Sequence, residues 1–470
     1  MQRLKTYLSV IDPRLLQHVG GKPGEFIRQF RAKKYLNETA LIEDICQGDK
    51  DLVYYQQLKT NVLKILQSFA VVSQFRGSNP LKKKLDFCRK KFLLAQKFTS
   101  SGERMEGIRL TKQAYTLAVE YDFVHMASEL ASALYTEHVY YSISKRKAKY
   151  YATQVKRHTL AYLAEKEAED LYYQYILENK SVGFLRKAAA SIPLETVKCM
   201  FLKARLELAY YFKLLDYQGI LKACDSGLSM LKDKKGVYSS WLSVFTSSKG
   251  IALMATGQHQ QADEVFTQAS KYAPARTFND CLMTLYRTIN FLHSGDYQQA
   301  YELYLENKRC RFDEIRQQFA IIEGYMGFLA HYGYVQLKKT FRIGKYLNEN
   351  ILTHNQKQGD NISILIAELL IYLARDRGKF IDRVEAVKNY SYRHLRDKDT
   401  LRAKRFIRIL CTLPNANFHL VALRRKTQKH FTYLKKQPIF IGHNAGIIEL
   451  IPFDKLLNII VDNLKCKAVS

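Results

Sequence analysis

Apolar residues recur every three to four positions along most of this chain, which is the period of an amphipathic helix. The pattern is clearest in residues 247–274, SSKGIALMATGQHQQADEVFTQASKYAP. There Ala262, Phe266 and Ala269 fall on one face of a helix. Gly257 lies between the two halves, where a turn is needed, and the proline that closes the stretch cannot continue a helix. The stretch therefore predicts a helix, a tight turn, a second helix and a stop.

Small residues mark where these two helices would approach each other, at Gly250 and Ala262. The pattern resembles a tetratricopeptide (TPR) repeat, which places Gly, Gly, Ala, Phe, Ala and Pro at these relative positions. Each of these residues is present in 247–274. The early Trp and the mid-helix Tyr of the family are replaced by Thr246 and Leu253.

Two weaker copies of the unit flank the best one, at residues 208–232 and 288–308. Their contact positions, Ile220 and Ala300, lie 42 residues before and 38 residues after Ala262 (262 − 220 and 300 − 262). The family unit is about 34 residues long, so these repeats have slightly longer linkers. The resemblance implies an all-α, TPR-like solenoid of helical hairpins, with a helical head before it and a helical cap after it.

We divide the chain into a helical head (1–75), TPR-like repeats (81–415) and a basic C-terminal cap (416–470). In the cap, residues 438–452 (PIFIGHNAGIIELIP) predict either a small β-hairpin or a loop with one helical turn. A final helix is expected over 453–464, because the end of a repeat array needs a covering element.

The head has short helices before a longer one, the outline of a helix-turn-helix, although any helical hairpin shares this outline. Gly20–Gly24 (GGKPG) is expected to break structure. The longer helix begins near Asp51, where Gln56 and Gln57 could reach bases but the carboxylate would face phosphate. The alternative is a head that only packs as a cap on the repeats.

The repeat resemblance also implies a concave face lined by the first helix of each pair, where a peptide could bind. The same side chains could instead pack against neighbouring helices. Carrying the groove positions of the family over to this chain gives Arg205, Lys213, Ser247, Met254, Tyr286 and His293.

Charge adds a second hypothesis. The 74 Lys and Arg outnumber the 44 Asp and Glu, which gives a formal net charge of +30. Such an excess suggests an anionic partner: nucleic acid, an acidic protein or a membrane surface. The excess is densest in residues 387–436, with 14 basic and 2 acidic residues. The candidate patch there is Arg393, Arg396, Arg402, Lys404, Arg405, Arg408, Arg424, Arg425 and Lys429.

Aromatic residues are interleaved with these cations, and that combination suits nucleic-acid backbones and stacked bases. The alternative is that Arg402, Arg405 and Arg408 form one solvated face of an amphipathic helix.

Recognisable catalytic motifs are absent from the sequence. It contains no G-x-x-x-x-G-K phosphate loop, no H-E-x-x-H, no C-x-x-C and no G-x-S-x-G. We therefore expect no enzyme activity, no cofactor and no metal. The eight cysteines are scattered, which fits buried free thiols in a reducing compartment.

The most apolar run, Ile362–Ala374, has 13 residues and contains Glu368. A membrane span needs about 20 apolar residues, so no membrane insertion and a cytoplasmic location are expected. The sequence does not specify an oligomeric state.

The sequence thus favours a non-enzymatic interaction protein that binds a protein partner, with an acidic partner as one option, through a TPR-like groove. The alternative is a nucleic-acid-binding regulator of the transcription type that uses the head or the C-terminal basic patch.

Overall fold

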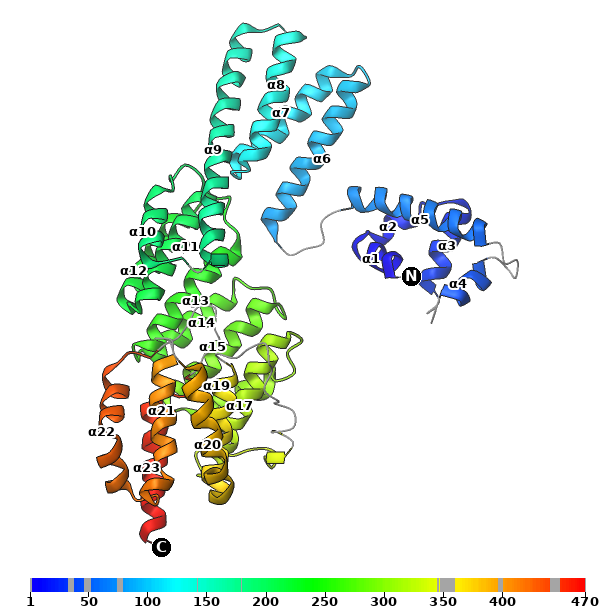
Figure 1. Ribbon diagram of the computed structural model, residues 1–470. Coiled ribbons are helices and arrows are strands. Elements are labelled where there is room, and N and C mark those ends of the chain that lie inside the picture. The colour runs from blue at the N-terminus through cyan, green and yellow to red at the C-terminus, as the bar shows by residue number, and fades with distance from the viewer. Residues whose placement is uncertain are drawn as a thin grey trace. The chain divides into compact units, whose positions relative to one another are not determined.

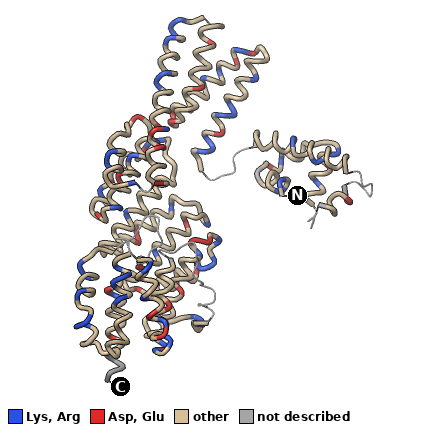
Figure 2. The backbone as a smooth tube through the Cα atoms, viewed as in Figure 1, with Lys and Arg blue, Asp and Glu red and all other residues tan. Residues whose placement is uncertain are grey.

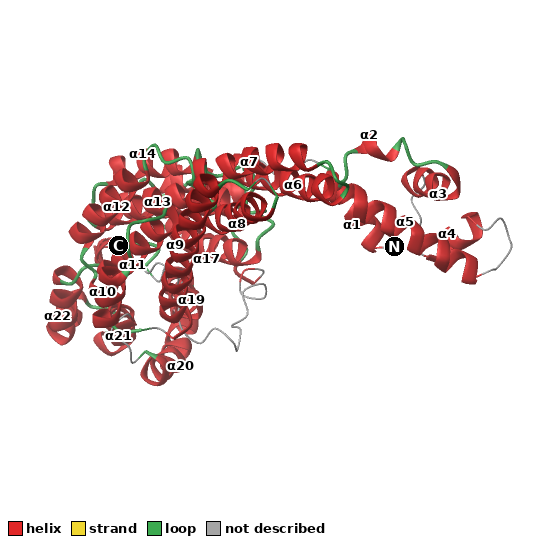
Figure 3. Cartoon of the chain, turned by 90° about the horizontal axis from the view of Figure 1, so that it is seen from above, coloured by secondary structure: helices red, strands yellow, loops and turns green. Residues whose placement is uncertain are grey.

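The computed structural model describes residues 2–32, 38–45, 52–73, 79–141, 143–178, 180–344, 346, 360–395, 400–439 and 449–469. Every regular element within these residues is a helix, and helices and loops alone make up the cartoon in Figure 3. The prediction of an all-α protein is therefore confirmed (Figure 1). Contacts divide the chain into two compact units, residues 1–163 and 164–470, which are described separately.

The first unit begins with five helices that share a hydrophobic core of their own, formed by side chains such as Phe26, Leu58 and Val62. The helices are α1 (Gln2–Val10), α2 (Pro13–Leu16), α3 (Gly21–Ala32), α4 (Glu38–Ile45) and α5 (Leu52–Val72).

The expected break over Gly20–Gly24 is wrong, because α3 begins at Gly21 and runs through the rest of the motif. Pro23 lies in the first turn of the helix, where its missing N–H is not needed. Gly21 adopts a φ of +62°, so the chain makes its bend at the residue that opens the helix.

Three helices and the start of a fourth complete the first unit: α6 (Pro80–Ser100), α7 (Arg104–Glu120), α8 (Val124–Tyr140) and α9 (Lys145–Glu178). Asn79 caps α6 by accepting from the backbone N–H of Leu81 at 3.0 Å. Gly107 lets α7 approach α6 closely, since a Cβ there would lie 2.3 Å from Thr99 Oγ1.

The second unit contains residues 247–274 and the two stretches that flank them, 208–232 and 288–308. Its helices α10 (Val182–Ser191), α11 (Val197–Leu214), α12 (Tyr217–Leu231), α13 (Ser239–Ala255), α14 (His259–Ser270), α15 (Phe278–Ser294) and α16 (Tyr297–Asn307) each pack on the next. The predicted helix, turn and helix of residues 247–274 is confirmed as the end of α13 and all of α14.

The close approach expected between α13 and α14 is present. A Cβ on Gly250 would lie 2.6 Å from the ring of Phe266, so a larger residue would displace that ring. Ala262, Phe266 and Ala269 are fully buried together, as their spacing predicted. Gly257 makes the turn with a φ of +80°, a conformation that glycine adopts without strain.

The remaining helices continue the same hydrophobic core. They are α17 (Asp313–His331), α19 (Asp360–Arg375), α20 (Arg377–His394), α21 (Leu401–Thr412), the 3-10 turn η2 (Pro414–Ala416), α22 (Leu420–Lys436) and α23 (Phe453–Val469). The apolar run Ile362–Ala374 forms α19 and is mostly buried. In the described part of the chain, no helix combines the length and the apolar character that crossing a membrane requires.

The predicted terminal helix is confirmed as α23. The expected hairpin or loop at 438–452 falls mainly on residues 440–448, which lie outside the described residues.

Candidate functional site

The predicted groove positions are mostly buried. Met254 is 1% exposed and His293 is 0% exposed, and Ser247 and Tyr286 are buried as well. Phe266 stacks on Tyr286, with ring centroids 5.6 Å apart, so the tyrosine ring contacts the adjacent hairpin. Met254 and Tyr286 belong to the hydrophobic core, and Ser247 and His293 are buried polar residues, so none of the four side chains faces solvent.

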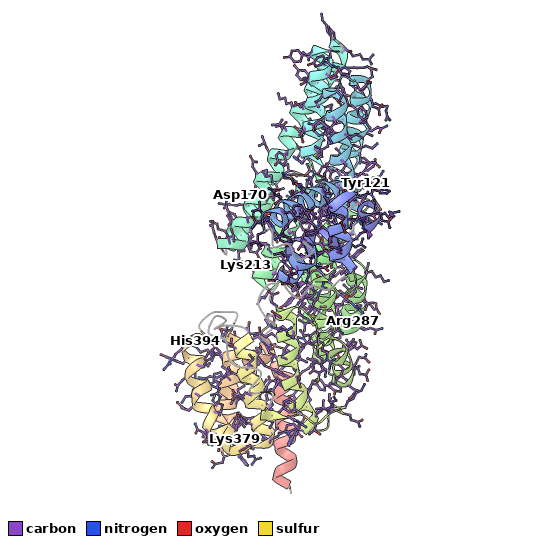
Figure 4. All side chains as sticks on the ribbon, turned by 90° about the vertical axis from the view of Figure 1, so that its right-hand side faces the viewer. Tyr121, Asp170, Lys213, Arg287, Lys379 and His394 are labelled. Carbon is purple, nitrogen blue, oxygen red and sulfur yellow. The ribbon has the colours of Figure 1, made fainter. Side chains whose placement is uncertain are left out.

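The other two groove positions, Arg205 and Lys213, are half-buried and contact the end of α9. Arg205 Nη2 donates to the Tyr172 hydroxyl at 2.8 Å, and its guanidinium lies 5.7 Å from the centre of the same ring. Lys213, labelled in Figure 4, donates to the backbone carbonyl of Lys180 and lies 5.7 Å from the ring centre of Tyr175. Both cations therefore help to hold α9 against α11.

Segments near the C-terminus contact helices α12 and α15. His293 Nε2 on α15 donates to the backbone carbonyl of Glu449 at 2.8 Å, and Lys455 donates to the carbonyl of His293. Tyr217 at the start of α12 donates to the carbonyl of Ile439. Burial lowers the pKa of His293 to about 4, so the ring is neutral near pH 7. The segment that carries Glu449 and Lys455 thus covers the face of α15 that includes His293.

Within the predicted basic patch, the placement of Arg402 on a solvated face is wrong. Its side chain is 6% exposed and forms an ion pair with Glu449, which is 2% exposed. Its Nη1 also donates to the carbonyls of Leu434 and Gln437, at 2.7 and 2.6 Å. Arg402 therefore joins α21 to the end of α22 and to residue 449. Sequence alone did not reveal this because the pairing carboxylate lies 47 residues away.

Arg405 also has a structural contact. Its Nη1 donates to His430 Nδ1 at 3.1 Å, and its guanidinium lies 5.3 Å from the ring centre of Tyr433. Burial and the nearby cations Arg405, Arg408 and Lys429 lower the pKa of His430 to about 4. Arg405 thus belongs to the α21–α22 contact and is only partly available to a ligand.

The helix α22 presents the largest group of exposed cations in this region. Leu423, Thr427, His430 and Leu434 form its buried face, at helical spacing. The opposite side has no acidic residue, and the α22 tube in Figure 2 carries blue segments and no red ones. The exposed cations of α22 are Arg424, Arg425, Lys426, Lys429, Lys435 and Lys436.

The patch predicted from the sequence does not include Lys426, Lys435 and Lys436. The signal that identifies them is that residues 400–448 contain ten Lys and Arg and no Asp or Glu. A helix of this composition has no carboxylate of its own to neutralise its exposed cations.

A cleft of about 660 Å³ lies between α20 and α21, next to α22. Lys404 and Arg408 line it from α21, and the largely exposed Tyr392 lines it from α20. Lys426 reaches the rim of this cleft, where it donates to the carbonyl of Asn415 at 2.6 Å. Lys426 therefore joins α22 to the rim of the cleft that Lys404 and Arg408 line. We define the C-terminal cationic surface as Lys404, Arg408, Arg424, Arg425, Lys426, Lys429, Lys435 and Lys436.

Of the remaining predicted patch residues, Arg393 is exposed at the end of α20, whereas Arg396 lies outside the described residues. In the head, Gln56 and Gln57 are exposed near the start of α5, and Asp51 lies outside the described residues.

The described residues contain no cluster of three or more His, Cys, Asp or Glu side chains that could hold a metal ion. Burial raises the pKa of Cys88 to about 11 and that of Cys224 to about 12, so neither thiol is a nucleophile near pH 7.

Comparison with known proteins gives no relative for this chain. No protein-family model, no curated protein and no solved structure matches it.

Proposed function

We propose that this chain is a non-enzymatic binding protein that holds the phosphate backbone of a nucleic acid on its C-terminal cationic surface. The observation that carries the proposal is the run of exposed cations on α22, with the exposed Arg408 on α21, in a segment of the sequence without a carboxylate. Lys and Arg that neutralise phosphates release counterions, and this supplies sequence-independent affinity.

The dimensions of the surface support an extended polyanion. The 17 residues of α22 span about 25 Å, at 1.5 Å per residue. Exposed cations occur from Arg424 to Lys436, so they follow most of that length. Duplex DNA carries one negative charge per about 1.7 Å of its axis, which provides many phosphates within this distance.

Binding without strict sequence preference is the mode that these residues favour. Lys and Arg contacts to phosphate position a protein on nucleic acid and do not read bases. Tyr392 is 74% exposed beside Lys404 and Arg408, and its ring offers a stacking surface for an unpaired base.

The proposed function is tested by fluorescence anisotropy with a labelled generic duplex at increasing salt. We expect saturable binding at low salt, with an affinity that falls linearly on a logarithmic salt scale. A titration that shows no binding at low salt would exclude this function.

A protein partner on TPR-like repeats is the second candidate, and exposed apolar side chains on α9 favour it. Tyr173 is 55% exposed and Leu177 is 81% exposed. Such residues at the surface often mark a protein contact. A pull-down with Leu177→Glu that captures the same partners as wild type would exclude this contact.

A further inference from the structure

A second cleft, of about 860 Å³, opens between α16, α17, residues 337–342 and Tyr346 of the second unit. Ligand clefts usually measure about 300–1,000 Å³, so its size suits a small molecule. It is separate from the C-terminal cationic surface and shares no lining residue with it.

Positive charge dominates the wall of this α16–α17 cleft. Six cations line it, whereas Glu323 is its only lining carboxylate among the described residues. The cations are Lys308, Arg309, Arg316, Lys338, Lys339 and Arg342.

Most of these cations have no carboxylate to neutralise them. Arg316 pairs with the exposed Asp313, but the other five form no ion pair within the described part of the chain. A concave site lined by one sign of charge concentrates ligands of the opposite sign. The cleft therefore favours an anion that carries several charges.

The backbone that carries three of the cations is held in place. The backbone N–H of Lys338 donates to the Tyr301 hydroxyl at 2.9 Å, and that of Gln336 donates to Gln298 Oε1 at 3.0 Å. Phe341 packs closely against α17, where a Cβ on Gly327 would lie 2.6 Å from its ring. Lys338, Lys339 and Arg342 are therefore presented by an anchored segment.

The inner wall of the cleft differs from its rim. Tyr304 is buried in this wall, and its hydroxyl donates to Oε2 of the exposed Glu323 at 2.8 Å. The half-buried Lys308 lies 5.4 Å from the ring centre of the same tyrosine. The half-buried Leu305, Ala320 and Leu337 add apolar lining. An organic group could contact this wall while its anionic part stays at the rim.

We propose that the α16–α17 cleft binds a small polyphosphate ester, in which a phosphate chain contacts the rim cations and an organic group contacts the apolar wall. Nucleoside triphosphates have this chemistry. The cations supply charge-assisted hydrogen bonds to phosphate oxygens. The carboxylate of Glu323 is an acceptor for a hydroxyl or amino group of the ligand. This site does not depend on the nucleic-acid proposal.

Isothermal titration calorimetry with ATP, adenosine and inorganic tripolyphosphate, in a chelating buffer, tests the site. We expect ATP to bind more tightly than either of the other two probes. Equal affinity for ATP and tripolyphosphate would overturn the role of the apolar wall. If none of the probes binds, the site itself is overturned.

Charge reversal locates the binding. We expect Arg309→Glu/Lys339→Glu to weaken ATP binding about tenfold or more, because two of the exposed cations that line the cleft become repulsive. The matched control is Lys222→Glu/Lys271→Glu, two exposed lysines outside the cleft with the same change of net charge. Equal weakening in both pairs would show that ATP responds only to the total charge, and would overturn the proposal.

A third variant separates this site from the C-terminal cationic surface. Arg424→Gln/Arg425→Gln/Lys429→Gln should keep the wild-type affinity for ATP. If ATP binding is lost in this variant and kept in Arg309→Glu/Lys339→Glu, the ligand binds on α22 and the cleft proposal is wrong.

Discussion

Arg402 and Glu449 form a buried ion pair, with Arg402 Nη2 3.0 Å from Glu449 Oε2. The two side chains are 6% and 2% exposed. Glu449 Oε2 also accepts from the backbone N–H of Phe453 at 3.2 Å, at the start of α23. The pair therefore connects α21, α22 and α23, and it withdraws one arginine from the basic surface that the sequence suggests.

Removing one member of this pair should strongly destabilise the second unit. We expect Arg402→Met to lower the free energy of unfolding by about 3–5 kcal/mol, because Glu449 would keep a buried charge without its partner. Urea unfolding followed by circular dichroism measures the change. The control is Arg393→Met at an exposed position, which should change stability by less than about 0.5 kcal/mol. Equal stability of the two variants would contradict a structural role for the pair.

His293 should make stability depend on pH. Its pKa is lowered from 6.5 to about 4 by burial, so between these values the unfolded chain binds a proton that the folded chain does not. The stabilisation that depends on neutral, buried His293 is complete above pH 6.5 and is lost as the pH falls toward 4. The loss amounts to about 3 kcal/mol, at 1.36 kcal/mol per pKa unit.

Comparison of wild type with His293→Gln isolates this contribution, because glutamine can still donate to the Glu449 carbonyl. Unfolding free energies measured from pH 7 to pH 4.5 should fall more steeply for the wild type. Parallel curves for the two proteins would show that His293 is not buried in its neutral form.

The α13–α14 hairpin should not tolerate a larger residue at Gly250. A Cβ there would lie 2.6 Å from the ring of Phe266, so Gly250→Ala forces the ring to move and should destabilise the protein by about 1–3 kcal/mol. Gly183→Ala is the control, since the nearest atom to its new Cβ is Ser181 Oγ at 3.9 Å. Thermal melting should show a lower midpoint for Gly250→Ala alone. A midpoint unchanged from wild type would mean that the helices do not approach as closely as described.

Much of the helical architecture could be predicted from the sequence because helix packing follows a local rule. The spacing of Ala262, Phe266 and Ala269 defined the buried face of α14, and Gly257 defined its turn. A local rule also gave the wrong prediction of a break at Gly20–Gly24. Pro23 lies in the first turn of α3, where proline is compatible with a helix.

The candidate site was harder to predict because exposure depends on contacts between distant segments. The burial of His293 depends on the backbone near Glu449, 156 residues away. Arg402 and Arg408 belong to the same basic helix, but one is buried against Glu449 and the other is exposed. The amino-acid composition located the excess of positive charge. Only the packing of α20, α21 and α22 shows which cations are held in contacts within the protein and which are exposed to a ligand.

The salt dependence of duplex binding in two triple variants tests the proposed function most directly. Each variant neutralises three exposed cations on a different helix. The test variant is Arg424→Gln/Arg425→Gln/Lys429→Gln on α22, and the control is Lys82→Gln/Lys83→Gln/Lys84→Gln on α6, where all three lysines are exposed. Each lost phosphate contact lowers the slope of log K against log salt by about 0.9, so the α22 variant should lose about 2.7 (3 × 0.9) and the α6 variant should match wild type. Equal slopes for all three proteins, or a larger loss in the α6 variant, would contradict nucleic-acid binding by the C-terminal cationic surface.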